Sequence, residues 1–167
     1  MKRIIIGVIL FCILGILCSC SKVEANSMTS PVPIDDVVDA VHNGAQSEFG
    51  YSEVSRYYLE DYFSELSNVN NVRIYKCNDS LNFNEFGVFE FTSHKAAKNG
   101  LQGIQRYLKK AKENFENGVV YDIKEYPKFQ NAKAKVFDNY VIYTILEEKQ
   151  TKNVFNNIEK TQQNKGL

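Results

Sequence analysis

The chain has 167 residues, of which 44% are hydrophobic and 13% aromatic, and this is enough for one folded domain with a substantial core. Its 20 basic and 20 acidic residues balance, so the sequence gives no electrostatic basis for binding nucleic acid or for broad adhesion to anionic lipid. The aromatic residues are all tyrosine and phenylalanine, which is typical of a folded domain containing β-sheet rather than of a disordered chain.

The first 19 residues have the pattern of a bacterial lipoprotein signal peptide. Lys2 and Arg3 precede an apolar run that ends at about Leu17, and this run is shorter than the roughly 18–20 residues of a membrane-spanning helix. The run ends in Leu17-Cys18-Ser19-Cys20, which resembles a lipobox, where the cysteine after the cleavage site receives the lipid. We therefore predict a signal peptide over residues 1–19 and lipidation of Cys20. An uncleaved anchor or a conventional signal peptide are the alternatives.

Residues 20–33 are polar and end in proline, so we predict a flexible tether followed by a single domain over residues 34–167. Cys12 and Cys18 would leave with the signal and Cys20 would carry the lipid. Cys77 then has no disulfide partner in the folded part. We interpret Cys77 as a buried small hydrophobic residue, with a reactive thiol as the alternative.

Two helices are predicted at the start of this domain. The first begins at Ile34 behind Pro33 and ends near Gly44, because its apolar residues recur at helical spacing. A second, short helix is predicted over residues 55–65, where Tyr58, Tyr62 and Leu66 share a face. An asparagine-rich turn follows at residues 68–71.

A strand over residues 72–77, a loop and a second strand over residues 85–91 form the first predicted hairpin. The longest helix follows, with Ser93 as its N-cap and Asn117-Gly118 at its end. Its apolar residues alternate in steps of three and four, which is the clearest periodicity in the chain. Gly100 and Gly103 weaken a helix interior, and close packing onto a sheet would explain their presence.

A second hairpin is predicted from alternating residues around Ala134, a turn at Asp138-Asn139 and an apolar strand over residues 140–146. A type I′ turn there would require positive φ at both turn residues. A last amphipathic helix spans about residues 152–162. The order α-α-β-β-α-β-β-α predicts an α+β fold in which two antiparallel β-hairpins form one sheet against a long packing helix.

Both faces of the last predicted strand are apolar. Val141, Tyr143 and Ile145 lie on one face, and Tyr140, Ile142 and Leu146 lie on the other. The long helix can cover only one of them, so the second face requires the N-terminal helices, the last helix or a partner.

The sequence contains few candidates for chemistry. His42 and His94 have no second histidine or cysteine at ligand spacing, so we expect no metal or cofactor and interpret both as surface or capping residues rather than catalytic bases. No phosphate-binding loop and no nucleophile motif is found. Cys77 with a distant histidine could imitate a thiol hydrolase, but the local signatures of such enzymes are missing.

Three other groups of residues have a functional alternative to a structural one. Glu60-Asp61 and Glu147-Glu148 could suggest a glycosidase, but adjacent residues do not face each other across a bond to be cleaved. The basic side chains of the long helix predict a solvated face, or docking to a phosphate-rich wall polymer or lipid headgroup. The aromatic cluster over residues 57–63 predicts helix packing on the sheet, or a platform for glycans.

The chain resembles a family of uncharacterised lipoproteins of Gram-positive Firmicutes that is known as a domain of unknown function. The resemblance rests on Asn84-Glu85-Phe86-Gly87-Val88-Phe89, Tyr126-Pro127 and Asp138-Asn139-Tyr140-Val141. Relatives usually have glycine where this chain has Asp138. The resemblance implies a secreted, lipid-anchored domain and no established activity, so no functional residue carries over.

These observations together predict a lipid-anchored lipoprotein on the extracytoplasmic face of the cell membrane. We expect a non-catalytic module that binds an envelope protein or a cell-wall component. A small cell-wall-active enzyme and an accessory subunit of a membrane transporter are the alternatives.

Overall fold

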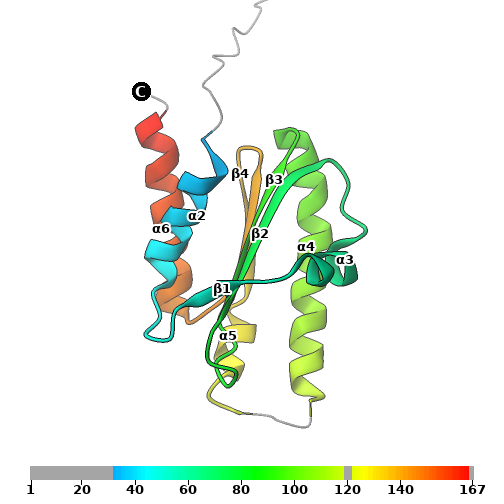
Figure 1. Cartoon of the computed structure of the whole chain (residues 1–167), viewed down its shortest axis with the longest axis vertical. Coiled ribbons are helices and arrows are strands. Elements are labelled where there is room, and N and C mark those ends of the chain that lie inside the picture. Colours follow the sequence, from blue (N-terminus) through cyan, green and yellow to red (C-terminus); the bar gives the residue numbers. More distant parts are fainter. Residues whose placement is uncertain (1–31, 119–121, 166–167) are drawn as a thin grey trace, which may run out of the picture.

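The computed structural model describes residues 32–118 and 122–165 (Figure 1). One five-stranded antiparallel sheet has the strand order β1-β2-β3-β5-β4. The elements in chain order are α2 (Ile34–Ala45), β1 (Tyr51–Glu53), α3 (Arg56–Phe63), β2 (Val69–Cys77), β3 (Glu85–Phe91), α4 (His94–Glu116), α5 (Tyr126–Gln130), β4 (Lys133–Phe137), β5 (Tyr140–Ile145) and α6 (Glu148–Lys165).

The predicted α+β fold is confirmed, with both hairpins in one sheet and the long helix packed against it. Two short elements were not predicted. The three residues of β1 add an edge strand beside β2, and the five residues of α5 lie between α4 and β4. Both are too short to show a periodicity in the sequence.

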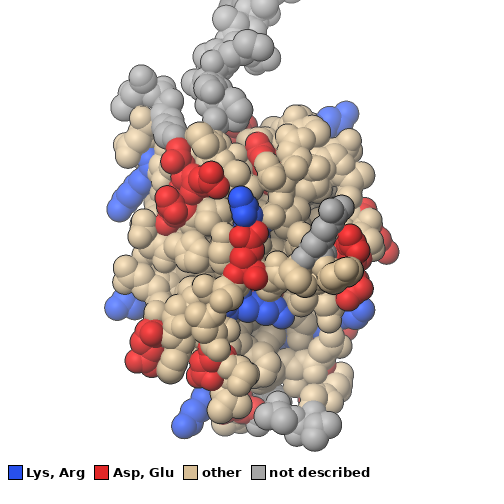
Figure 2. Space-filling view, viewed as in Figure 1, with Lys and Arg blue, Asp and Glu red and all other residues tan. Residues whose placement is uncertain are grey.

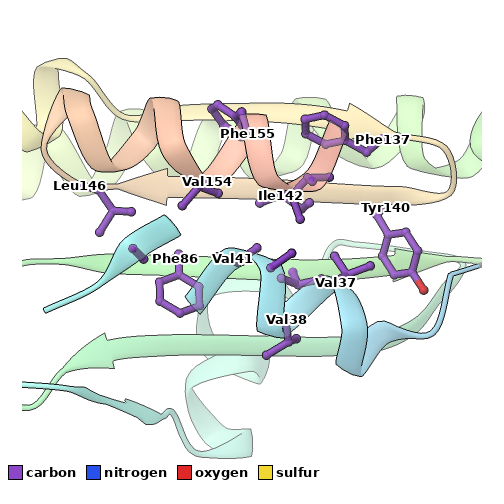
Figure 3. Close-up of a cluster of buried hydrophobic side chains, with 14 residues drawn as sticks. Val37, Val38, Val41, Phe86, Phe137, Tyr140, Ile142, Leu146, Val154 and Phe155 are labelled. Atoms are coloured by element: carbon purple, nitrogen blue, oxygen red, sulfur yellow. The ribbon is translucent and has the colours of Figure 1, made fainter. Parts of the chain in front are cut away.

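Helices cover both faces of the sheet (Figure 1). On one face, α2 and α6 enclose the core cluster shown in Figure 3, in which Val37, Val41 and Val154 meet Phe86 and Ile142. On the other face, α4 packs together with α3 and α5. The predicted division of the last strand is confirmed, because alternate residues of β5 belong to the two clusters. The chain's own helices therefore bury both faces, and a binding surface must lie elsewhere.

Two glycines allow the helices to approach closely. A Cβ atom on Gly100 would overlap the ring of Phe91, which confirms that this glycine lets α4 pack on the sheet. A Cβ on Gly44 would overlap the backbone of Val154, so α2 and α6 contact each other at this point. The prediction that Gly103 also packs onto the sheet is wrong, because this glycine lies against the side chain of Leu66 after α3.

The hairpin turn at Asp138-Asn139 is confirmed, since Phe137 pairs with Tyr140 across it. The type I′ geometry is wrong, because φ is positive at Asp138 (51°) and not at Asn139. The Asn139 side chain instead donates to the carbonyl of Phe91, and Asn139 O accepts from the Phe91 amide. These bonds join the turn to the end of β3 and fix the second turn residue with negative φ.

Helix α5 lies at one end of the domain, and the start of α2 and the end of α6 lie at the other (Figure 1). Tyr140 ties this region to the sheet by donating its hydroxyl to the carbonyl of Val32, 2.5 Å away. Among residues 32–118 and 122–165, no helix has the length and apolarity to cross a bilayer.

Candidate functional site

A pocket of about 270 Å³ opens beside α4, between α3 and α5. We call it the aromatic pocket. Its aromatic lining residues are Tyr58, Tyr62, Phe83, Tyr107, Phe115 and Phe129. Because α5 and the last turn of α4 contribute to it, the pocket lies in the half of the domain away from the start of α2 (Figure 1).

The lining rings form two groups of mutual contacts. On one side the rings of Tyr58 and Tyr62 lie 4.5 Å apart, and Tyr62 meets Tyr107 at 5.8 Å. On the other side Phe115 stacks on Phe129 at 4.4 Å, and Phe83 lies edge-on to Phe115 at 5.2 Å. These contacts fix the walls before any ligand is present, so a flat or apolar ligand would find a formed site.

Glu85 forms the polar floor between these walls. It is the first residue of β3, and only 7% of its side chain is exposed. Its Oε1 accepts the hydroxyls of Tyr107 at 2.5 Å and Tyr143 at 2.6 Å. Its Oε2 lies 3.3 Å from Nζ of Lys76 and 3.4 Å from the hydroxyl of Tyr58. Each carboxylate oxygen thus has two partners, which a buried carboxylate requires.

The direction of these hydrogen bonds follows from the carboxylate. Tyr107 donates its hydrogen to Glu85, so it must accept from Tyr58, whose hydroxyl lies 2.5 Å from its own. Lys76 also lies over the ring of Tyr58, with Nζ 4.2 Å from the ring centroid. Three tyrosines, one lysine and one glutamate therefore form a single connected network.

The protonation states of the network are held by burial and by Glu85. Burial, followed by the negative charge of Glu85, raises the pKa of Tyr58, Tyr107 and Tyr143. Burial alone would lower the pKa of Lys76, but the attraction of Glu85 and the hydrogen bonds to Tyr58 and Glu85 outweigh it and raise that pKa. The phenols are therefore neutral and the lysine is charged at neutral pH.

Two further polar residues, Lys110 and Asn114, stand at the mouth of the pocket, both exposed on α4. Of the residues that the structure describes, Glu85 is the only acidic one in the lining, and it is already paired with Lys76. Elsewhere, the face in Figure 2 carries both signs of charge, and uncharged side chains cover most of it. The mouth of the pocket thus has a local excess of positive charge on a molecule whose charges balance overall.

The two histidines lie outside the pocket lining. His42 is half-buried, with its ring packed against Tyr75 at 4.5 Å and Phe86 at 4.9 Å, so the prediction of a surface or capping residue is wrong. Burial lowers the pKa of His42, which favours the neutral imidazole in contact with these rings. His94 is exposed at the start of α4, as predicted, and its Nδ1 lies 2.6 Å from the carbonyl of Asp138.

The remaining predicted residues are also separate from the pocket. Cys77 ends β2 and is half-buried rather than buried, with Sγ 3.8 Å from Oγ of Ser47. The acidic pairs 60–61 and 147–148 are exposed, and none of these four residues lines the pocket. Within residues 32–118 and 122–165, no three histidine, cysteine, aspartate or glutamate side chains converge as metal ligands. Cys20 and the signal over residues 1–19 lie outside the described residues.

The aromatic cluster of α3 serves two purposes. Phe63 is buried against Tyr107 and Phe89, which is the predicted packing role. Tyr58 and Tyr62 instead line the pocket, while Tyr57 is 77% exposed and does not. Sequence reasoning missed the rest of the site, because Glu85, Tyr107 and Tyr143 come from three separate elements. A usable signal was present in Glu85, a charged residue that precedes the apolar run Phe86–Phe89.

A family model described as "Domain of unknown function (DUF4358)" matches residues 53–146. This range includes α3, β2, β3, α4 and β5, so every residue of the Glu85 network lies within it. No curated protein and no solved structure matches the chain significantly.

Proposed function

We propose that this chain, which belongs to the DUF4358 family of domains of unknown function, is a lipid-anchored extracytoplasmic lipoprotein that binds another envelope component through its aromatic pocket. In this proposal Cys20 carries the lipid and residues 20–33 form the tether. The domain is a binding module rather than an enzyme, and its partner is an envelope protein or a cell-wall component.

The observation that carries the proposal is the preformed state of the pocket. Its walls are aromatic rings in mutual contact, and its floor is a carboxylate whose oxygens are already occupied by three donors, Tyr107, Tyr143 and Lys76. Rings fixed in this way offer apolar contact area at little further cost in entropy. Tyr62 and Phe83 remain 44% and 37% exposed at its edge, where a partner would cover them.

The hydrogen bonds that already occupy the Glu85 carboxylate favour a binding function over catalysis. A general base needs a lone pair within reach of the proton it removes. Both oxygens of Glu85 are instead committed to tyrosines and Lys76, and no other carboxylate lines the pocket within the described part of the chain. A transporter accessory would use the pocket in the same way and would differ only in the identity of its partner.

The lipid anchor is supported by the sequence pattern around Cys20 and by the position of the pocket. Helix α2 follows the tether and begins at the end of the domain away from α5, which borders the pocket (Figure 1). A domain anchored through residues before α2 would thus present the pocket away from the lipid. Replacement Cys20→Ala should abolish palmitate labelling in cells, and equal labelling of wild type and variant would overturn the anchor.

The pocket is tested with two matched substitutions on α4. Asn114 and Asn99 are both exposed asparagines of this helix, but only Asn114 lines the pocket. The mature chain over residues 20–167, kept unlipidated by Cys20→Ser, should sediment with isolated envelopes of the cells that make it. Asn114→Trp should abolish this sedimentation and Asn99→Trp should not. Equal sedimentation of the two variants would contradict the proposed binding site.

A further inference from the structure

We propose that the ligand of the aromatic pocket carries an oxyanion, a carboxylate or a phosphate, on a flat or apolar body. This inference rests on the proposed binding function and adds the chemical class of the ligand. It follows from the arrangement of charge at the pocket, considered separately for the floor, the mouth and the walls.

The floor offers no site for a cationic ligand. Among the described residues, Glu85 is the single acidic one in the lining, and its oxygens accept from Tyr107 and Tyr143 and pair with Lys76. A ligand ammonium group would have to displace Lys76 from a contact of 3.3 Å in a site where the carboxylate is 7% exposed. A cation would therefore replace an existing ion pair without adding one.

The mouth, in contrast, offers donors that have capacity left. Lys76 has three N–H groups, of which the contacts with Glu85 and Tyr58 use two, and its side chain is 44% exposed. Lys110 is exposed and forms no ion pair with any residue in the described ranges 32–118 and 122–165. The pocket lining thus carries two ammonium groups and one carboxylate, and Asp61, which borders an adjoining hollow with Lys110, does not line the pocket. An oxyanion in the pocket would balance the second ammonium group.

The walls select the rest of the ligand. Phe83, Phe115 and Phe129 form one side and Tyr58 and Tyr62 the other, so a group between them contacts ring faces and edges. Such walls favour an apolar or planar group and give an extended polar chain few hydrogen-bond partners. Charge at the mouth and rings in the walls together specify an anionic head on an apolar body.

The test uses three compounds with one ring system: 2-naphthoate, 2-naphthyl phosphate and 2-naphthol, which is uncharged at pH 7. Each is titrated by calorimetry into the mature chain carrying Cys20→Ser. At least one of the two anions should bind roughly tenfold or more tightly than 2-naphthol, as expected for one added charge-assisted hydrogen bond. The comparison of the carboxylate with the phosphate identifies which oxyanion the pocket prefers.

Two lysine variants locate the effect. Lys110→Gln should weaken the preferred anion roughly three- to tenfold and leave 2-naphthol unchanged. Lys109→Gln is the matched control, because Lys109 is the adjacent exposed lysine and does not line the pocket. It should leave all three affinities unchanged. Equal effects of the two substitutions would overturn the inference.

The outcomes separate this inference from the function on which it rests. If all three compounds bind with equal affinity and Asn114→Trp abolishes their binding, the pocket binds apolar groups and the oxyanion inference is overturned. If none of the three binds, the inference is also overturned. The proposed function is then decided separately by the envelope sedimentation of Asn114→Trp and Asn99→Trp.

Discussion

Gly87 and Tyr143 face each other across the β3–β5 pair, and the tyrosine ring occupies the space that a side chain at position 87 would fill. A Cβ atom on Gly87 would overlap the ring. The ring lies over the glycine so that its hydroxyl reaches Oε1 of Glu85, 2.6 Å away. The floor of the aromatic pocket thus depends on the absence of a side chain two residues from Glu85.

Gly87→Ala should displace Tyr143 and destabilise the domain by about 1–3 kcal/mol, the usual cost of inserting a methyl group into a packed core. Denaturant unfolding measures this change. Gly103→Ala is the control, because its added methyl would meet only the flexible end of Leu66 and alanine favours the helix. If Gly87→Ala is as stable as Gly103→Ala, the ring does not require the glycine.

Glu85→Gln should destabilise the domain by about 1–3 kcal/mol. The amide keeps the shape of the side chain but removes the charge opposite Lys76. In one orientation its NH₂ group meets the donating hydroxyls of Tyr107 and Tyr143, and in the other it meets the ammonium group of Lys76. Glu90→Gln in the same strand is the control. Glu90 accepts an exposed hydrogen bond from Asn71 and lies near the hydroxyl of Tyr140, whose hydrogen goes to the carbonyl of Val32, so the substitution should change stability by less than about 0.5 kcal/mol. Equal unfolding midpoints for the two variants would show that the network contributes little.

The domain should lose stability at alkaline pH. The pKa of Tyr58, Tyr107 and Tyr143 is raised in the folded state, by burial and then by Glu85, so each folded phenol holds its proton above the pH at which an unfolded tyrosine, with a pKa of about 10, releases it. Their contribution is therefore complete below about pH 10 and falls as pH rises above that value. Burial also raises the pKa of Tyr51, to about 12.

Absorbance at 295 nm measures this effect, because it follows tyrosinate formation. Part of the tyrosine absorbance should appear only together with unfolding, as followed by circular dichroism. Tyr107→Phe should reduce the amplitude of this late phase. Complete tyrosine ionisation near pH 10 in a protein that stays folded would contradict the buried network.

Asp138→Gly should be more stable than Asp138→Ala by about 1 kcal/mol. Both substitutions remove the same carboxylate, but φ at this position is 51°, where only glycine avoids the steric cost of a Cβ atom. Thermal unfolding of the two variants makes the comparison. Equal stability would mean that position 138 does not have positive φ in solution.

The fold could largely be predicted because its helices and turns are determined by residues that are close together in the sequence. The spacing of apolar residues in α4, the N-cap at Ser93, whose Oγ accepts from the Ala96 amide at 3.2 Å, and the two-residue turn before Tyr140 each follow from neighbouring residues. The sign of φ at Asn139 did not follow, because hydrogen bonds to Phe91, 48 residues away in sequence, decide it.

The site was not predictable from periodicity in the same way. Tyr58, Glu85, Tyr107 and Tyr143 each occupy an ordinary position in their own element, and 85 residues separate the first from the last. Only the packing of α3 and α4 on the sheet brings their hydroxyls to one carboxylate. The position of His42 among aromatic rings has the same origin, because Tyr75 and Phe86 come from β2 and β3.

The most direct test of the binding function is site-specific photocrosslinking in the cells that make the protein. A benzoylphenylalanine is introduced at Tyr62, which lines the pocket, or at Tyr57, which is more exposed in the same helix but lies outside it. Our account predicts a discrete crosslinked product from position 62, lost when Asn114→Trp is added, and none from position 57. Equal crosslinking from both positions, or none from position 62, would contradict it.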